Sequence, residues 1–206
     1  LDPALARALA AGLRRAQLEP SAVAALLEGD GVGLRLAARL EGFAPGVAEQ
    51  EQRLLALCER LGCPAEPLPD AAAAACWARH DVVRAGGALR VKATFPPARL
   101  AEAVRAALRP LLSALRQGAA VLYPTLGAAF ASGEPAAPGA AAAVAAARQA
   151  LVGLGGALVV AAAPAAIRAA VDPWGPPPRA LAVMRRLKEQ LDPAARLAPG
   201  HFVGGI

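Results

Sequence analysis

The chain has 206 residues, 56% of them hydrophobic, and its 22 Lys and Arg against 16 Asp and Glu give a formal charge of +6. This length suits one domain with a small appendage, and the hydrophobic fraction excludes a disordered chain. The positive charge alone suggests nucleic acid, but the arginines are scattered, with short pairs only at Arg14–Arg15 and Arg185–Arg186. We therefore expect solvated basic surfaces and no nucleic-acid partner.

The cysteines indicate the redox compartment and test for a metal site, and one apolar run tests for a membrane-spanning helix. Three cysteines, an odd number, argue against a disulfide framework and favour a reducing, cytoplasmic compartment. Cys58, Cys63, Cys76 and His80 approach the spacing of a zinc site. Because Cys58 falls within a predicted helix, we expect no metal. The uncharged run at 150–167 is broken by glycines and a proline, so we expect a helix and a strand rather than a transmembrane span.

The first half of the chain alternates helical and extended patterns. Leucines recur every four residues after the cap at Asp2 and Pro3, which gives a helix one apolar face. Apolar and polar residues alternate at 34–41, as in a strand that is buried on one side. The expected elements are a helix at 3–17, a strand at 23–27, a turn at 29–31, a strand at 34–41, and helices at 45–61 and 71–84.

The second half again shows a half-buried strand, at 89–95, followed by prolines and a helix. The helix that Pro96 opens ends near 117–118, and its inner face carries Leu100, Val104, Leu108 and Leu111. The remaining expected elements are a strand at 119–124, its hairpin partner at 125–131, a loop at 132–139, a helix at 140–154, a strand at 157–161 and a short helix at 164–171.

Two units of strand, proline and helix, at 34–61 and 89–115, predict an α+β fold. The expected architecture is an antiparallel sheet with helices packed on one face, in the ferredoxin-like or split βαβ arrangement. Alternation argues against a doubly wound parallel sheet, because the strands of such a sheet are buried on both faces. We assign 1–171 to this domain and 172–206 to its C-terminal helix and docking tail.

One face of the predicted sheet should be open and basic. The residues placed on it are Arg35, Arg39, Arg90, Lys92, Thr94 and Tyr123. Arg and Lys are natural partners of carboxylates, so this face could hold a small anionic substrate or could simply be solvated. Our candidate substrate-binding residues are Arg35, Arg90, Lys92 and Tyr123. No catalytic residue is assigned, because the sequence lacks a nucleophile motif and a glycine-rich phosphate loop after a strand.

The C-terminal segment 172–206 combines a proline-rich turn, an amphipathic helix and an apolar end at 202–206. Free termini usually fray, and exposed Phe, Val and Ile side chains there are unfavourable unless something covers them. We therefore expect a strap that docks on a partner. Trp174 has two open interpretations: it fills the edge of the core, or it anchors a partner interface.

Four stretches of this tail carry a family resemblance: DPWGPPP at 172–178, MRRLK at 184–188, LDP at 191–193 and PGHFVGGI at 199–206. They resemble the C-terminus of the glycolate oxidase E subunit, an FAD-linked oxidase of the vanillyl-alcohol oxidase and p-cresol methylhydroxylase type. The resemblance implies that the chain is the C-terminal cap domain, which covers the flavin ring and shapes the substrate pocket. It makes Pro199, Gly200 and His201 the cofactor-binding positions. The family commonly has Asn where Ala198 stands and Arg or Lys where His201 stands.

The resemblance implies oxidation of glycolate or a related 2-hydroxy acid, with the hydride accepted by FAD. The FAD would be bound mainly by a domain or chain not present here, so the isolated chain is expected to be inactive and to bind FAD weakly. Implied partners are that FAD-binding domain or subunit, a second flavin subunit and an iron–sulfur subunit, in the cytoplasm or peripheral to the inner membrane through the complex. The alternative is a ferredoxin-like small-molecule-binding or scaffold module without its own catalysis.

Overall fold

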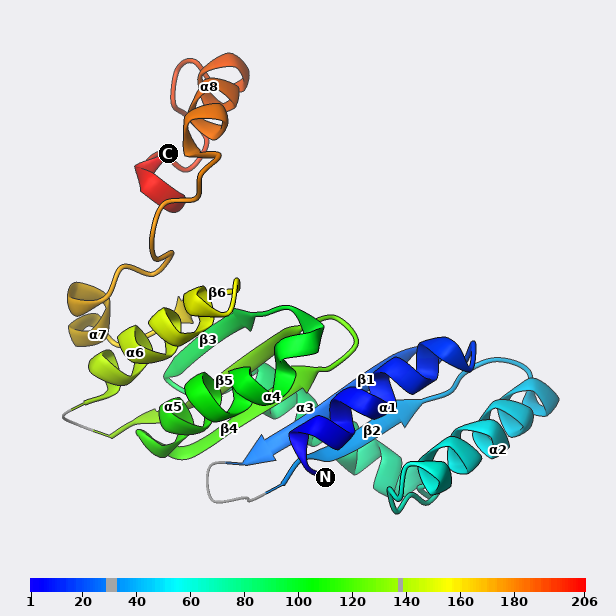
Figure 1. Cartoon of the computed structure of the whole chain (residues 1–206). Helices are drawn as coiled ribbons and strands as arrows, with labels where there is room; N and C mark the ends of the chain where they lie inside the picture. Colours follow the sequence, from blue (N-terminus) through cyan, green and yellow to red (C-terminus); the bar gives the residue numbers. More distant parts are fainter. Residues whose placement is uncertain (29–32, 137–138) are drawn as a thin grey trace.

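The computed structural model describes residues 1–28, 33–136 and 139–206, and its centre is a six-stranded sheet (Figure 1). The strands are β1 (Ala22–Glu28), β2 (Arg35–Arg39), β3 (Leu89–Thr94), β4 (Leu115–Tyr123), β5 (Ala128–Pro135) and β6 (Ala157–Ala162). They lie in the order β2-β1-β4-β5-β3-β6, and every neighbouring pair is antiparallel. The predicted α+β class with an antiparallel sheet is therefore confirmed.

One face of the sheet, called the inner face, packs against helices and encloses the main core. The helices on it are α1 (Pro3–Arg15), α4 (Leu100–Ala103), α5 (Arg109–Ser113) and α6 (Ala140–Gly153) (Figure 1). The four residues predicted for the inner side of the helix after Pro96 are all 0% exposed: Leu100, Val104, Leu108 and Leu111. The 3.6-residue period of apolar side chains is the reason that this packing could be predicted.

A π-helical turn, η2 (Val104–Leu108), joins α4 to α5. Pro110 is the second residue after this turn. Proline has no N–H to give to the carbonyl four residues earlier, and its ring clashes with that carbonyl in a regular helix. A wider turn relieves the clash, so the helix continues past the proline with a local change of pitch.

The helix α2 (Ala44–Arg60) lies beside α1 and forms a second, smaller core with it. Gly12 of α1 makes this contact possible, since a Cβ there would lie 2.9 Å from the Cδ1 atom of Leu57. Cys58 and Cys63 are both buried in this small core as free thiols. The cysteines therefore contribute to packing.

The boundaries of β4 and β5 differ clearly from the predictions. The strand β4 begins at Leu115 rather than at 119, and its register with β5 shifts between Arg116 and Ala119. Gln117 has a left-handed φ of 53° at this irregularity, so the residues that were expected to end a helix instead form a bulged strand. The strand β5 continues to Pro135, through part of the predicted loop at 132–139. The predicted turn at 29–31 and positions 137–138 of that loop lie outside the described residues.

The register places the predicted basic side chains on the face opposite the core, called the outer face. Directly opposed residues of antiparallel strands point to the same side of a sheet. One such row runs from Arg35 of β2, through Leu26, Val121 and Phe130, to Lys92 of β3. The alternation at 34–41 and 89–95 therefore indicated the correct faces.

One helix departs from the prediction that all helices share one face. The helix α3 (Asp70–Ala85) crosses the outer face, where Val83 is 2% exposed. It packs with Trp77 and Val83 against small side chains of the middle strands, including Ala24 and Ala119. The Oγ atom of Ser132 donates a 2.6 Å hydrogen bond to the carbonyl oxygen of Val83. Because the alanine side chains on the central strands are small, α3 can pack closely against this face of the sheet.

The connectivity from β3 onward is strand, helix, strand, strand, helix, strand, with β3 lying between β5 and β6. After β6, the short helix α7 (Ala165–Ala170) and an extended segment lead to α8 (Leu181–Leu191), which stands away from the sheet (Figure 1). In the part of the chain that the structure describes, no helix combines the length and apolarity needed to cross a bilayer.

Replacing Leu108 with Ala should destabilise the domain strongly. Leu108 is 0% exposed at the centre of the inner-face core, so the substitution leaves a cavity that costs about 2–5 kcal/mol. Urea unfolding followed by circular dichroism would measure the loss. Leu126→Ala is the matched control: Leu126 is 72% exposed, so its change should stay within about 0.5 kcal/mol. Equal losses for the two variants would contradict this assignment of the core.

Candidate functional site

Four aromatic side chains form a continuous row where α3 crosses the outer face. The ring centroids are 5.4 Å apart for Trp77 and His80, 5.8 Å for His80 and Tyr123, and 6.1 Å for Tyr123 and Phe130. All three contacts are edge-to-face, a favoured geometry for aromatic pairs. Trp77 and His80 are three residues apart on one side of α3, whereas Tyr123 and Phe130 come from the adjacent strands β4 and β5. We call these four residues the aromatic row.

Cationic side chains lie over both ends of the aromatic row. The guanidinium of Arg39 is 4.4 Å from the ring centroid of Trp77. At the other end, Arg84 lies 5.2 Å and the Nζ atom of Lys92 5.9 Å from the centroid of Phe130. Cation–π contacts of this kind stabilise the cations without neutralising them.

Arg84 and Lys92 approach the same ring, and no ion pair among the described residues includes either of them. Two neighbouring positive charges without a carboxylate partner repel each other and attract an anion. We call Arg84, Lys92 and Phe130 the cationic end of the row. A small carboxylate is the simplest ligand that would fit its charge.

The structure separates the sequence-predicted substrate residues into two groups. Arg35 forms a 3.0 Å ion pair with Glu28, and Glu28 also accepts from Arg79 at 3.1 Å. Arg35 and Lys92 occupy the same cross-strand row but lie four strand spacings apart, about 19 Å. The structure therefore brings Lys92 and Tyr123 together around Phe130, and it does not bring Arg35 to them.

Arg90 connects β3 to the end of α3. Its Nη1 atom donates a 2.6 Å hydrogen bond to the carbonyl oxygen of Ala85, the last residue of the helix. A cation at a helix C-terminus interacts favourably with the unpaired carbonyls and the helix dipole. The Nε atom of Arg90 is buried and, within the described residues, has no hydrogen-bond partner. Arg90 thus binds the C-terminal end of α3 through Nη1, while its Nε–H makes no hydrogen bond within the described residues.

His80 is held on both of its ring nitrogens. Nδ1 lies 2.8 Å from an Asp81 carboxylate oxygen, and Nε2 lies 2.9 Å from the hydroxyl oxygen of Tyr123. The His80 side chain is 15% exposed and that of Asp81 is 76% exposed, so the contact with Tyr123 is partly shielded from water whereas the contact with Asp81 is open to it. Burial raises the pKa of Tyr123, Asp81 raises it further and Arg84 opposes the change. The phenol therefore stays protonated at neutral pH.

The sequence prediction included Tyr123 and Lys92 but omitted Trp77, His80 and Arg84. These three residues follow helical spacing on α3, a signal that was present in the sequence. It was not informative alone, because nothing local showed which face of the sheet α3 would cover. The suggested metal set is not assembled: across the described residues, no three His, Cys, Asp or Glu side chains are grouped as a metal ion requires.

Residues 172–206 form a second structure, the C-terminal lobe, in which the tail folds back on α8. Asp192 accepts hydrogen bonds from the Nζ atom of Lys188 at 2.6 Å and from two backbone N–H groups, of Arg196 at 2.8 Å and Leu197 at 2.9 Å. Trp174 donates from Nε1 to the carbonyl oxygen of His201 at 3.1 Å. The Trp174 ring also meets Phe202 edge to face at 4.7 Å. The lobe is therefore ordered by its own polar contacts.

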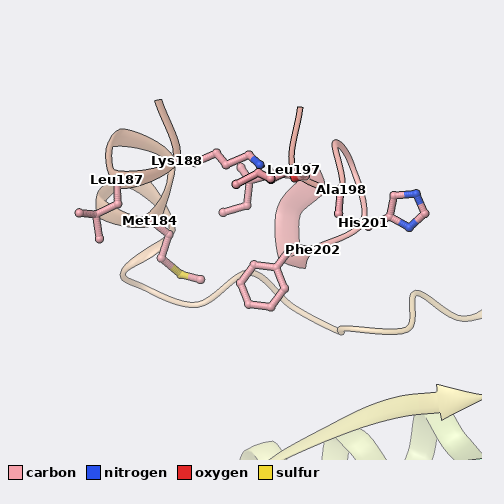
Figure 2. Close-up of a pocket in the computed structure, with 8 residues that line it drawn as sticks. Met184, Leu187, Lys188, Leu197, Ala198, His201 and Phe202 are labelled. Atoms are coloured by element: carbon pink, nitrogen blue, oxygen red, sulfur yellow. Dashed lines mark hydrogen bonds between the residues drawn. The ribbon is translucent and has the colours of Figure 1, made fainter. Parts of the chain in front are cut away.

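The lobe nevertheless leaves much apolar surface uncovered. A shallow groove of about 430 Å³ lies between α8 and the tail (Figure 2). Its lining residues are Met184, Leu187, Lys188, Leu197, Ala198, His201, Phe202 and Ile206. Leu187 is 54%, Leu191 80% and Leu197 68% exposed, and α8 has no buried residue. Clustered apolar exposure of this kind marks interaction surfaces.

The predicted cofactor residues lie in this lobe, at the turn of Pro199, Gly200 and His201. Gly200 has a φ of 75°, and Ala198 just before it has a φ of 45°, a left-handed conformation in which Asn is better tolerated than Ala. The lobe and α3 occupy different parts of the molecule (Figure 1). The chain by itself therefore does not bring His201 to the aromatic row.

Comparisons with known proteins identify no relative of this chain. No family model matches it, and neither a curated protein nor a solved structure does so.

Acid should loosen the C-terminal lobe. The hydrogen bond from Lys188, followed by those from the N–H groups of Leu197 and Arg196, lowers the pKa of Asp192 from 3.8 to about 2. A carboxyl whose pKa is lower in the folded state stabilises it above pH 4, and this contribution is lost as the pH falls through about 2. Fluorescence of Trp174 in a Trp77→Phe background would follow the change, because Trp174 contacts Phe202 in the tail.

Asp192→Asn provides the control for this titration. The variant should show a looser Trp174 environment already at pH 7 and a smaller change between pH 5 and pH 2. Circular dichroism recorded in parallel would separate loosening of the lobe from unfolding of the sheet. If the Trp174 fluorescence of Asp192→Asn followed the same pH profile as that of the unsubstituted protein, the stabilising role of the Asp192 carboxylate would be contradicted.

Proposed function

We propose that this chain is the cap domain or cap subunit of an FAD-dependent 2-hydroxy-acid oxidoreductase of the glycolate oxidase E type. The observation that carries the proposal is the C-terminal lobe, which is ordered by its own hydrogen bonds and yet leaves its apolar groove uncovered. This lobe contains the residues that resemble the family. An ordered apolar surface at the end of a domain is what docking on a flavin-binding partner requires.

The charge of the lobe supports a protein partner with an acidic rim. Its cations outnumber its acids, and three of the cations belong to α8. The cations of the lobe are Arg179, Arg185, Arg186, Lys188 and Arg196, and its acids are Asp172, Glu189 and Asp192. An apolar centre with a charged surround is the usual anatomy of an interface. The proposed partners are the FAD-binding domain or subunit and, in the assembled complex, a second flavin subunit and an iron–sulfur subunit.

The cofactor is expected to be held mainly by the partner. FAD needs a cradle for its pyrophosphate, and the sequence has no G-x-G-x-x-G loop after a strand. The groove of the lobe is lined mainly by apolar side chains, which suit contact with the apolar surface of a partner polypeptide but not with phosphates. Met184 and Phe202 would supply that apolar contact, and His201 lines the groove with them. When bound, the flavin would supply the hydride acceptor.

The substrate carboxylate is proposed to lie at the cationic end of the aromatic row. Arg84 and Lys92 carry charges that no described acidic residue pairs with, and Phe130 holds both side chains over one ring. Tyr123 lies next to Phe130 and offers a hydroxyl to the substrate. Arg35 is omitted from this site because of its distance and its ion pair with Glu28.

A second function fits one specific observation. The aromatic row and its cations come from a single chain, so they could bind a small organic anion without any flavin. The connectivity from β3 to β6 supports a ferredoxin-like, split βαβ unit, an arrangement that would suit a small-molecule-binding or scaffold module. Binding of a 2-hydroxy acid by the isolated chain with no flavoprotein partner would favour this alternative.

Disrupting the exposed face of α8 should separate the chain from its flavin partner. Leu187→Glu places a charge in the groove. The affinity of the variant chain for the co-expressed FAD-binding polypeptide should fall at least tenfold, because burying an unpaired charge in an interface is unfavourable. Affinity purification followed by flavin absorbance would measure complex formation. Leu126→Glu is the control: it lies at an exposed turn of the sheet and should leave the affinity for the FAD-binding polypeptide unchanged.

The isolated chain should be colourless after purification. Stoichiometric flavin on the chain alone would overturn the assignment of FAD to a partner. Undiminished binding by the Leu187→Glu variant would show that the lobe is not the docking surface.

Neutralising the cationic end should weaken substrate binding in the reconstituted complex. Arg84→Gln and Lys92→Met should each raise the KM for a 2-hydroxy acid roughly tenfold, since a charge-assisted hydrogen bond contributes about 1.5–3 kcal/mol. Arg105→Gln, an exposed arginine on the helical side, is the control and should leave KM within about twofold. Unchanged KM values for both test variants would favour a scaffold role for this chain.

A further inference from the structure

We propose that Asp81, His80 and Tyr123 form a proton-accepting relay, which takes the proton of a hydroxyl group bound over the aromatic row. The inference rests on the proposed function for the identity of the hydroxyl compound, a 2-hydroxy acid held by Arg84 and Lys92. The relay itself rests on the geometry of the three side chains. Tyr123 is its catalytic residue, and His80 and Asp81 are positioning residues.

The hydrogen-bond partners define the direction of the relay. An ionised Asp81 carboxylate can only accept, so the contact of 2.8 Å requires that Nδ1 of His80 carries the proton. Neutral His80 then has an unprotonated Nε2, which accepts from the Tyr123 hydroxyl at 2.9 Å. The phenolic O–H therefore points at His80. The lone pairs of the Tyr123 oxygen are left to accept a hydrogen bond from a ligand.

A proton can pass through these three groups without a free phenolate. The O–H bond of the substrate breaks and its proton moves to the Tyr123 oxygen, while the original phenolic proton moves to Nε2 of His80. The result is a neutral tyrosine, an imidazolium and the ligand alkoxide. Asp81 stabilises the imidazolium, as a carboxylate does for the histidine of a nucleophile–histidine–carboxylate triad. Burial raises the pKa of Tyr123, which disfavours a free phenolate at this position.

The surrounding charges are suited to the product of this transfer. On α3, Asp81 contacts His80. Arg84 lies one helical turn after His80 and approaches Phe130. On the strands, Lys92 also approaches Phe130. Arg84 and Lys92 would offset the negative charge that develops on the ligand oxygen. Arg39 lies over Trp77 at the other end of the row.

The first test uses the isolated chain and needs no flavin. Nitrogen-15 spectra of the imidazole rings should show His80 protonated on Nδ1 and unprotonated on Nε2 at neutral pH. The only other histidine, His201, is assigned with His201→Gln. Asp81→Asn should mix the two tautomers, and Tyr123→Phe should shift the Nε2 resonance. A ring of His80 protonated on Nε2, or one that does not respond to Tyr123→Phe, would overturn the relay.

The second test measures turnover in the reconstituted complex. General base catalysis commonly contributes 10²–10⁴-fold, so Tyr123→Phe and His80→Gln should lower kcat by roughly 100-fold or more with little change in KM. Asp81→Asn should lower kcat less and move the acidic limb of the pH–rate profile. Urea midpoints of the variants would verify that they are folded.

The outcomes separate the relay from the proposed function. Turnover of Tyr123→Phe and His80→Gln within twofold of the unsubstituted complex would overturn the relay and leave the oxidoreductase assignment standing. A complex that forms but oxidises no 2-hydroxy acid would contradict the proposed function. The imidazole spectra of the isolated chain would still decide whether Asp81 and Tyr123 set the tautomer of His80.

Discussion

The packing of α3 across the outer face of the sheet is the interaction on which the candidate site depends. Val83 is buried over the small side chains of β1 and β4, and Ser132 and Arg90 tie the last turn of α3 to the neighbouring strands. This contact fixes where the rest of the helix lies. It therefore sets the position of His80 against Tyr123 and of Arg84 over Phe130.

The two candidate surfaces differ in what they need from outside the chain. The aromatic row is complete within the domain, with its imidazole, phenol and cations in contact. The C-terminal lobe is ordered internally through Asp192 and Trp174, but its groove is open on one side. The proposed cap role would use both surfaces: one would recognise the small ligand, and the other would hold the partner that brings the cofactor.

Sequence patterns predicted the candidate site only in part. Strand alternation placed Lys92, Arg90 and Tyr123 on the outer face, because the side-chain period of a strand is two. The same rule also placed Arg35 there, and it is on that face, but alternation gives no strand order. The separation of Arg35 from Lys92 follows from the insertion of β1, β4 and β5 between them, which depends on long-range pairing.

The sequence by itself determined the helices and most strand positions, because apolar periodicity and Pro or Gly signals act over a few residues. It also determined that the tail would contain a proline-rich turn, a single amphipathic helix and an apolar end. Only the tertiary structure decided that α3 covers the outer face and that residues 77–84 meet residues 123–130. Those contacts join segments about forty residues apart, and their energy comes from shape-matched burial of Val83 over alanines, which no local pattern encodes.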